Sequence, residues 1–287
     1  MSHIDDALAR IDDRLEQERA PLLDLAHRIH AHPEVRFEEV RAAAWLTEAL
    51  EARGFAVERG VGGLPTAFRA RLDGRGPGPT VAVLCEYDAL PGLGHACGHN
   101  VIATMGAGAG FALAPLMPEL DGTLLVLGTP AEEGGGGKVT LLDAGVFDDV
   151  DAAIMIHPYK SSHPTMGTLA ATRWDVGFRG VPAHAAMAPH LGRNALDAVR
   201  LAFAGIDALR QQVRDDVRIH AVVTDGGAAA NIIPETAAMN VVARAKDGAH
   251  LFDELVPRLE NVFRGAAMMT GTEVEITPSS LPYLEIA

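Results

Sequence analysis

Cysteine is scarce in this sequence, with only Cys85 and Cys97 among 287 residues. Two cysteines cannot form a disulfide framework in a chain of this length, so we expect a reducing compartment. Basic residues are also few, because 24 Lys and Arg stand against 38 Asp and Glu and give a formal net charge of −14. This charge opposes binding to nucleic acid or to anionic lipid, so neither is an expected partner.

Long hydrophobic runs are absent as well. No stretch approaches the roughly 18 uninterrupted apolar residues of a membrane span, and the start, MSHIDDALARIDDRLEQ, lacks the apolar core of a signal peptide. We therefore expect a cytoplasmic protein that does not enter the membrane. The composition is that of an ordinary globular chain, with 48% hydrophobic and 22% charged residues, long enough for one large domain or two modest ones.

Three short apolar runs predict buried strands, at residues 80–85, 123–127 and 152–156. Solid β-rich runs of this length suit a sheet that is covered on both faces. Helical patterns occur between and before them, at residues 38–53 and 101–116. This alternation predicts an α/β domain over residues 1–168, with a mostly parallel sheet and helices on both faces.

The pattern changes from about residue 170, where Trp174, Val176 and Phe178 alternate with polar neighbours. Helical patterns follow at residues 194–213 and 250–268, and strand-like runs at 217–224, 238–245 and 272–277. The resulting order, β-α-β-β-α-β, predicts a ferredoxin-like α+β domain over residues 169–278.

Polar side chains follow each apolar run of the first domain. Glu86 and Asp88 come after the first run, Glu132 and Glu133 after the second, and His157 directly after the third. In open α/β sheets, ligands bind outside the carboxyl ends of the strands. We therefore expect these side chains to converge on one edge of the sheet.

Cys97 and His99 are separated by one residue, so in an extended segment their side chains face the same side. Thiolate and imidazole are ligands that suit zinc or a similar transition ion. Taken alone, the pair also fits a buried cysteine and a helix-start histidine without metal. Likewise His157, taken alone, fits a core histidine. Their place beside the strand ends favours metal ligands.

Glu132 and Glu133 are adjacent, so we expect their side chains to point in different directions, one toward metal and one toward substrate. That division suits metal-assisted hydrolysis, in which a free carboxylate takes a proton from the attacking water. The alternative is a solvated acidic pair in a glycine-rich loop. Asp88 suits a carboxylate that orients a ligand, and Glu86 suits either a ligand or a salt-bridge partner.

Five segments together resemble the aminoacylase/carboxypeptidase-G superfamily of dinuclear metallohydrolases. They are EYDALPGLGHACGHN (86–100), GTPAEEGGGGK (128–138), IHP (156–158), GVPAHAAMAPHLGRNALDA (180–198) and GGAAANIIPE (226–235). The sequences of these segments are most similar to those of the branch of indoleacetyl-amino-acid hydrolases, aminobenzoyl-glutamate hydrolases and related dipeptidase-like proteins. The likeness runs in order from about residue 27 to residue 245.

The resemblance implies metal-dependent hydrolysis of the amide bond of N-acyl amino acids or small dipeptides. It implies two divalent ions, zinc or manganese, and a lid domain that also forms a homodimer. Matched by motif, the metal ligands would be Cys97, His99, Glu133 and His157, with Glu132 as general base and acid and Asp88 as the orienting carboxylate. Many relatives carry a histidine ligand where this chain has Glu86, which puts Glu86 in doubt as a ligand.

In the second domain, His184 matches a histidine that, in relatives, extends across the dimer and stabilises the tetrahedral oxyanion. Asn231 and Arg244 match positions that look like substrate contacts, and a guanidinium suits a free carboxylate. His190, Arg193 and Asn194 lie at a helix start, where capping is the simpler role.

The resemblance has one mismatch, at the C-terminal end. Relatives return from the lid to the catalytic sheet and supply a last metal-binding histidine, whereas residues 279–287 correspond only to the start of that return. We expect either a fragment of a longer enzyme or a truncated product with an incomplete site. The alternative to a hydrolase is therefore a catalytically impaired remnant that acts only as a folded dimerising module. Thiol catalysis by Cys97 is a third hypothesis.

Overall fold

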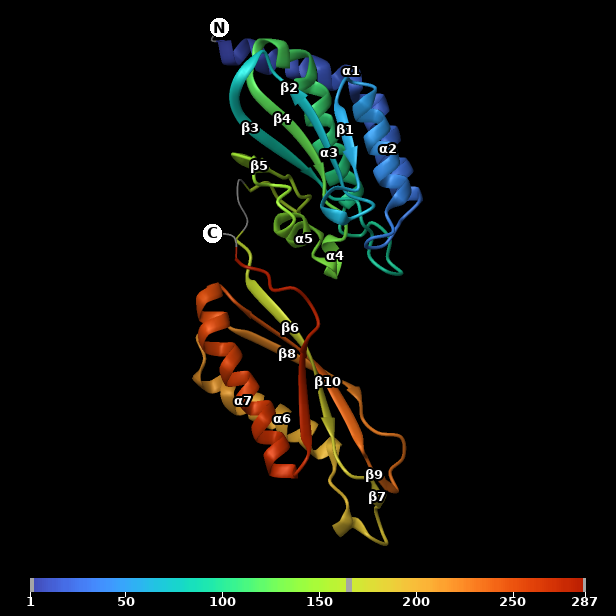
Figure 1. Ribbon diagram of the computed structural model, residues 1–287, viewed down its shortest axis with the longest axis vertical. Coiled ribbons are helices and arrows are strands. Elements are labelled where there is room, and N and C mark those ends of the chain that lie inside the picture. Colours follow the sequence, from blue (N-terminus) through green and yellow to red (C-terminus); the bar gives the residue numbers. More distant parts are fainter. Residues whose placement is uncertain (1–2, 164–166, 286–287) are drawn as a thin grey trace. The chain divides into compact units, whose positions relative to one another are not determined.

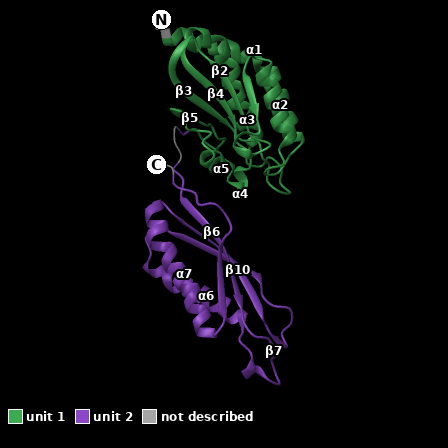
Figure 2. Cartoon of the chain, in the orientation of Figure 1, with its two compact units in different colours: residues 1–162 green, residues 163–287 purple. Residues whose placement is uncertain are grey.

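The chain folds into two compact units, Met1–Ser162 and His163–Ala287 (Figure 2). The computed structural model describes residues 3–163 and 167–285. The division falls before the boundary at residues 168 and 169 that the sequence suggested. The described residues after 278 belong to the second unit, where the Ser279 N–H donates to the Arg173 carbonyl at 3.0 Å.

The first unit contains a mixed five-stranded sheet in the order β1-β2-β4-β3-β5 (Figure 1). Its strands are β1 (Ala56–Arg59), β2 (Phe68–Asp73), β3 (Gly76–Cys85), β4 (Asp121–Gly128) and β5 (Ala152–Ile154). The apolar runs predicted as strands are β3, β4 and β5, and these pair in parallel. The predicted burial is wrong for β5, which ends at Ile154 and is exposed along its length. The strands β1 and β2 are antiparallel additions that the sequence patterns did not predict.

Helices cover one face of this sheet. They are α1 (His3–Ala31), α2 (Val40–Glu51) and α3 (His99–Leu113), and α3 continues into a 3₁₀ helix, η2 (Ala114–Glu119). A core of residues such as Ile29, Leu46 and Phe111 fills the space between the helices and the strands. Helix α3 lies very close to β3, because a Cβ at Gly106 would stand 2.5 Å from Cys85 Sγ. A side chain there would push the helix off the strand.

The opposite face has a smaller apolar cluster. Ala82, Leu125 and Leu127 are buried there against Phe147 and Val150, which follow α5 (Gly137–Asp143). A short turn of helix, α4 (Glu132–Gly135), and the 3₁₀ helix η1 (Val61–Gly63) complete the unit. The sheet thus carries its main helix layer on one face only.

One helical stretch, His99–Glu119, is long and apolar enough to cross a membrane by length and composition. It is α3 with η2, and 61% of its apolar window is buried inside the first unit. Its contacts with α1, β3 and β4 are those of a core helix.

A charged network ties α1 to the turn that follows α2 in the first unit. The Glu18 side chain is 8% exposed and forms ion pairs with Arg14 and Arg53, and the Arg53 guanidinium carbon lies 3.6 Å from the Phe111 ring centre. The Arg53 hydrogen bond, with the charges of both arginines, holds the pKa of Glu18 below its ordinary value of 4.5 against the opposing effect of burial.

Replacing Glu18 by Ala should lower the free energy of unfolding by about 2 kcal/mol, because it leaves two arginines without their partner. Both arginines keep some solvent contact, so the full cost of a buried unpaired charge does not apply. Because the folded pKa is depressed, the wild-type advantage is present above pH 4.5 and fades as the pH falls through the folded pKa. Urea unfolding at pH 7 and at low pH measures both effects, and an equal difference at the two pH values would contradict the assignment.

The second unit is a four-stranded antiparallel sheet with two helices on one face (Figure 1). The elements are β6 (Ala170–Arg179), α6 (Ala195–Leu209), β8 (Arg218–Asp225), β10 (Thr236–Ala245), α7 (Val256–Thr270) and β11 (Glu273–Pro278), and the strand order is β11-β6-β10-β8. Trp174, Val176 and Phe178 alternate into the core under α6 and α7, as their spacing predicted. Short 3₁₀ turns occur at η3 (Pro189–Leu191) and η4 (Arg210–Gln212), and a π-helical turn, η5 (His250–Leu255), leads into α7.

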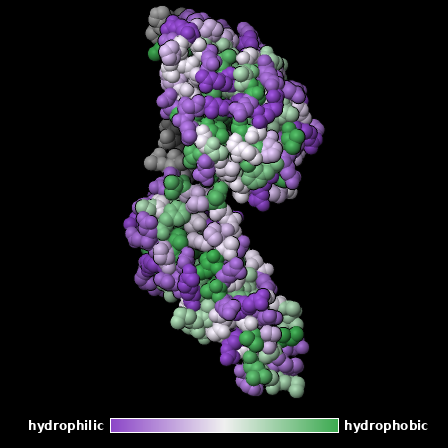
Figure 3. All heavy atoms as spheres, viewed as in Figure 1, coloured by the Kyte–Doolittle hydropathy of each residue, from purple (hydrophilic) through white to green (hydrophobic). Residues whose placement is uncertain are grey.

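A two-stranded ribbon of β7 (Ala183–His184) and β9 (Ile232–Ile233) extends from this unit. Figure 3 shows hydrophobic residues among hydrophilic ones at the end where Figure 1 places β7 and β9. The exposed apolar side chains of this stretch are Val181, Met187, Leu191 and Ile232, with Met187 as much as 81% exposed. This end of the unit therefore offers an apolar surface to solvent.

Candidate metal centre

The structure brings six of the predicted site residues together at the carboxyl ends of β3, β4 and β5. Asp88 follows β3, and Cys97 and His99 come from the loop that leads into α3. Glu132 and Glu133 follow β4, and His157 follows β5. All of them belong to the first unit.

His99 lies at the centre of this cluster and is completely buried. Its Nδ1 lies 3.0 Å from Asp88 Oδ1. The other ring nitrogen, Nε2, is buried without a hydrogen-bond partner among the described residues. It faces carboxylate oxygens of Glu86 at 3.4 Å and of Glu132 and Glu133 at 3.9 Å each. A buried imidazole nitrogen with no partner, surrounded by anionic oxygens, fits a cation between them.

Asp88 links His99 to the Glu132 loop. Its second oxygen, Oδ2, accepts the Glu133 N–H at 2.8 Å. Burial opposes ionisation of Asp88, but the His99 and Glu133 hydrogen bonds outweigh it and leave the pKa below the ordinary value. In the same way burial opposes the charged form of His99, yet the Asp88 hydrogen bond and the Glu86 charge raise its pKa. Asp88 and His99 therefore each favour the charged form of the other.

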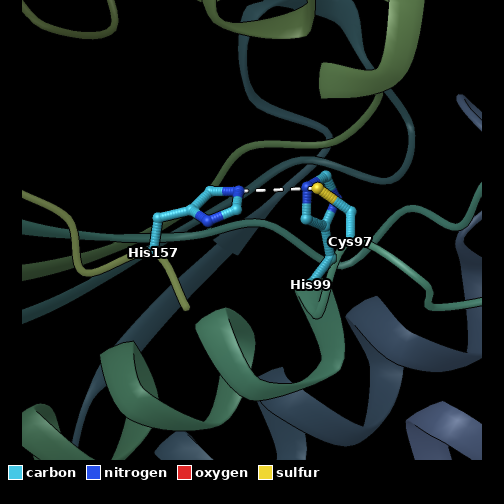
Figure 4. A group of neighbouring side chains, drawn as sticks. All are labelled: Cys97, His99 and His157. Atoms are coloured by element: carbon cyan, nitrogen blue, oxygen red, sulfur yellow. Dashed lines mark hydrogen bonds between the residues drawn. The ribbon is translucent and has the colours of Figure 1, made fainter. Parts of the chain in front are cut away.

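Cys97 and His157 turn toward each other beside His99 (Figure 4). Cys97 Sγ lies 3.5 Å from His157 Nε2. His157 Nδ1 lies 2.8 Å from the Pro158 carbonyl, and since a carbonyl only accepts, a neutral His157 ring carries its hydrogen on Nδ1 and a lone pair on Nε2. That lone pair points toward the thiol, in the orientation that a shared metal ligand needs.

The backbone between Cys97 and His99 differs from the extended segment that we expected. Gly98 has φ 86° and forms the N-cap of α3, so the two side chains converge through a left-handed turn. Asn100 lies inside the helix and donates to the Ala26 carbonyl at 3.3 Å.

The Cys97 thiol is not activated by its protein surroundings. Burial, the Glu133 hydrogen bond and nearby carboxylate charges raise its pKa to about 12. A nucleophilic cysteine needs a lowered pKa, so this environment argues against thiol catalysis. A bound cation would stabilise the thiolate, so the same environment is compatible with a metal ligand.

Glu132 and Glu133 do not diverge as expected, because each places a carboxylate oxygen 3.9 Å from His99 Nε2. The reason is the irregular backbone, in which Ala131 is left-handed and Glu133 has ψ 75°. The Glu132 side chain is the more exposed of the two, at 39% against 23%. Burial and the charge of Glu86 raise the pKa of Glu132.

Glu86, which the sequence left as either ligand or salt-bridge partner, forms an ion pair with Lys138 through Oε1. Its other oxygen is buried without a hydrogen bond among the described residues. Lys138 ends the GTPAEEGGGGK segment, but nothing in the sequence pattern gave it a role.

In the second unit, His184 and Asn231 lie on adjacent segments. His184 is exposed at the end of β7, and its Nδ1 accepts the N–H groups of Ala186 and Met187 at 3.3 and 3.2 Å. A ring nitrogen that accepts carries no hydrogen, so neutral His184 has its proton on Nε2, free to donate. The Asn231 carbonyl accepts the Ala185 N–H at 3.0 Å.

Arg244 is exposed near the far end of β10, whose other end follows β9. The fold therefore separates Arg244 from Asn231 by most of that strand. Asn194 caps α6, because its Oδ1 accepts from Leu196 N at 2.9 Å and Asp197 N at 3.3 Å. His190 lies in η3, and Arg193 pairs through its backbone with Val181.

Two groups of side chains could each hold a metal ion. One is Cys97, His99 and His157, and the other is His99, Glu132 and Glu133, with the ligand atoms of each group within 4.8 Å of one another. His99 belongs to both groups, and the predicted ligands Cys97, His99, Glu133 and His157 are divided between them. Sulfur, imidazole and carboxylate ligands fit zinc, and the carboxylate-rich group also fits manganese.

An α/β unit that gathers such ligands at the ends of parallel strands defines the class of protein: one with a candidate transition-metal centre at the usual ligand-binding edge of the sheet. Residues 79–272, more than half of the chain, match Peptidase family M20/M25/M40. The chain therefore belongs to this peptidase family, as the resemblance of its motifs predicted.

Two curated relatives illustrate the match. One of the p-aminobenzoyl-glutamate hydrolase subunits of Escherichia coli (strain K12) is 40% identical over 92% of this chain and 59% of its own length. The Xaa-Arg dipeptidase of Mus musculus is 38% identical over 96% of this chain and 67% of its own length. The chain thus spans about three fifths to two thirds of these relatives.

Among solved structures, the aminobenzoyl-glutamate utilization protein from Klebsiella pneumoniae has a similar fold. It superposes with a TM-score of 0.78 and 26% sequence identity, covering 96% of this chain and 79% of that chain. The mixed α/β fold of the family is therefore the fold of this chain.

Proposed function

We propose that this protein hydrolyses the amide bond of N-acyl amino acids or small dipeptides with the help of two divalent ions, zinc or manganese. The ligands would be Cys97, His99, Glu133 and His157. The observation that carries the proposal is the buried, unpartnered Nε2 of His99, which faces three carboxylates while Asp88 holds the opposite side of the ring.

Divalent ions in this cluster would polarise an amide carbonyl and make water a better nucleophile. Asp88 keeps the His99 ring in its orientation and ties it to the Glu133 backbone. Glu132 takes a proton from the attacking water and passes it to the leaving nitrogen. Its partly exposed carboxylate and raised pKa support this role, since a carboxyl that titrates nearer neutrality is a better proton shuttle.

His184 would stabilise the negative charge that develops on the carbonyl oxygen when water attacks the amide carbon. Because Nδ1 of His184 accepts two hydrogen bonds, the neutral ring carries its proton on Nε2. That proton supports a role as hydrogen-bond donor to the oxyanion. We propose that the second unit is a ferredoxin-like lid that forms a homodimer, through which His184 reaches the partner's site. The exposed apolar residues around His184 support a protein contact there.

Asn231 and Arg244 would contact the substrate, Arg244 by binding its free carboxylate. Because they lie toward opposite ends of β10, they would serve different parts of the substrate or different sites of a dimer. A cytoplasmic location remains part of the proposal, on the basis of the sparse cysteines.

The proposal is tested by release of free amino acid from a panel of amides. The panel contains p-aminobenzoyl-glutamate, indoleacetyl-amino acids, N-acetyl amino acids and dipeptides ending in arginine, each incubated with the protein and added zinc or manganese. We expect release from at least one member, and loss of release when a chelator is present. The alternative, a catalytically impaired dimerising module, predicts a folded protein that releases nothing under any of these conditions.

A further inference from the structure

Another buried carboxylate, Glu39, lies next to the candidate centre but outside its ligand groups. Glu39 is the N-cap residue of α2 and is completely buried. Its Oε1 accepts the N–H groups of Phe37 at 2.9 Å and Ala131 at 2.8 Å. Its Oε2 accepts the Thr66 hydroxyl at 2.9 Å. One side chain therefore joins three segments that are distant in the sequence.

The two N–H groups that converge on Oε1 belong to unusual residues. Phe37 has φ 64° and Ala131 has φ 57°, and they are the non-glycine residues with positive φ in the described part of the chain. Side chains with a Cβ avoid this left-handed region unless the surroundings compensate. The same carboxylate oxygen thus holds both strained turns.

The strained turn at Ala131 sets the direction of the site carboxylates. Ala131 directly precedes Glu132 and Glu133, and the Glu133 N–H is fixed on Asp88. The loop is also packed onto Phe37, because a Cβ at Gly135 would lie 2.9 Å from the Phe37 ring. Glu39 anchors the start of this loop and Asp88 anchors it two residues later.

The segment that carries Glu39 also holds the Asp88 side of the site. The Ala89 N–H donates to the Glu34 carbonyl at 2.8 Å, and Val35 and Ala89 form a parallel bridge. Residues 34–39 therefore connect the loop after β3 with the loop after β4.

We propose that Glu39 is a positioning residue, which holds Ala131 in its left-handed turn and so directs Glu132 and Glu133 toward His99. The consequence for metal binding rests on the proposed function, whereas the backbone effect does not. Glu39→Gln should preserve the positioning, because one amide oxygen can still accept both N–H groups while the amide nitrogen donates to Thr66. Glu39→Ala should lose it.

Hydrogen exchange of the metal-free protein tests the positioning directly. In Glu39→Ala, the amides of residues 131–133 should exchange at least about tenfold faster than in wild type, and in Glu39→Gln they should stay within about threefold. Glu18→Ala is the matched control, because it removes a buried carboxylate of the same unit that does not touch the loop. It should leave these amides unchanged when exchange is referenced to β4, which belongs to the same unit. Equal acceleration in Glu39→Ala and Glu18→Ala, or no acceleration in Glu39→Ala, would overturn the proposal.

Zinc affinity, measured by competition with a chromogenic chelator, gives the second readout. Glu39→Ala should bind zinc about 10- to 100-fold more weakly, with Glu39→Gln and Glu18→Ala close to wild type. If wild type binds no zinc or manganese, the proposed function fails, while the exchange result still decides the role of Glu39. If wild type binds metal and Glu39→Ala binds it equally well, the positioning role is refuted.

Discussion

Replacing Glu132 by Gln should reduce amide hydrolysis by about 10²- to 10⁴-fold, the range of a lost general acid and base. The metal content per chain should stay at the wild-type value. Glutamine keeps the size of the side chain but cannot take up the proton of the attacking water. Steady-state kinetics with the best substrate of the panel, together with elemental mass spectrometry of the variant, measure both quantities.

Glu133→Gln is the matched control for this experiment, since the two residues are adjacent and both face His99 Nε2 at 3.9 Å. It should lose metal as well as activity, because Glu133 is assigned as a ligand. Because both carboxylates lie at the same distance from His99, comparing the two variants tests which of them is the metal ligand and which is the general base. Unchanged turnover in Glu132→Gln, or metal loss in Glu132→Gln but not in Glu133→Gln, would contradict the division of roles.

Replacing His99 by Asn should remove both ions, because His99 belongs to both ligand groups. The asparagine amide nitrogen can take the place of Nδ1 and keep the hydrogen bond to Asp88, while the Nε2 atom is lost. We expect the metal content to fall from about two ions per chain to well below one, with no detectable hydrolysis. Elemental mass spectrometry after dialysis against metal-free buffer is the measurement.

Cys97→Ala is the comparison, because Cys97 belongs to one group only. It should retain about one ion per chain. Circular dichroism and urea unfolding establish that both variants are folded before their metal content is compared. A His99→Asn protein that still carries as much metal as wild type would show that the cluster is not the metal site.

The parallel half of the first sheet and the core of the second unit could be predicted from the sequence. Residues 80–85 and 123–127 are solid apolar runs, and Trp174, Val176 and Phe178 alternate, so burial alone determines their structure. By contrast, α1 was missed because its surface is dominated by charged residues. The strands β1 and β2 were missed because charged residues interrupt the apolar pattern of AVER and FRARLD.

The convergence of six site residues in the first unit was also predictable, because they follow strand ends or form recognisable motifs. Its detailed geometry was not. The turn at Gly98 and the left-handed turn at Ala131 depend on contacts between distant segments, so a rule based on neighbouring residues expected an extended Cys97–His99 segment and diverging glutamates.

Glu39 and Lys138 could not be assigned from the sequence for the same reason. Glu39 forms hydrogen bonds with Thr66 and Ala131, and Lys138 forms an ion pair with Glu86. Each of these partners is remote along the chain. Helix patterning describes Glu39 only as a polar residue at a helix start. A buried carboxylate becomes significant once its partners in the fold are known.

The central claim is that the strand-end cluster of the first unit holds two divalent ions. The most direct test is the metal-to-chain ratio of the purified wild-type protein, measured by elemental mass spectrometry after loading with zinc or manganese and removal of excess metal. We predict about two ions per chain, displaced by a strong chelator with loss of hydrolysis. A ratio near zero in a protein that is folded by circular dichroism would contradict the claim.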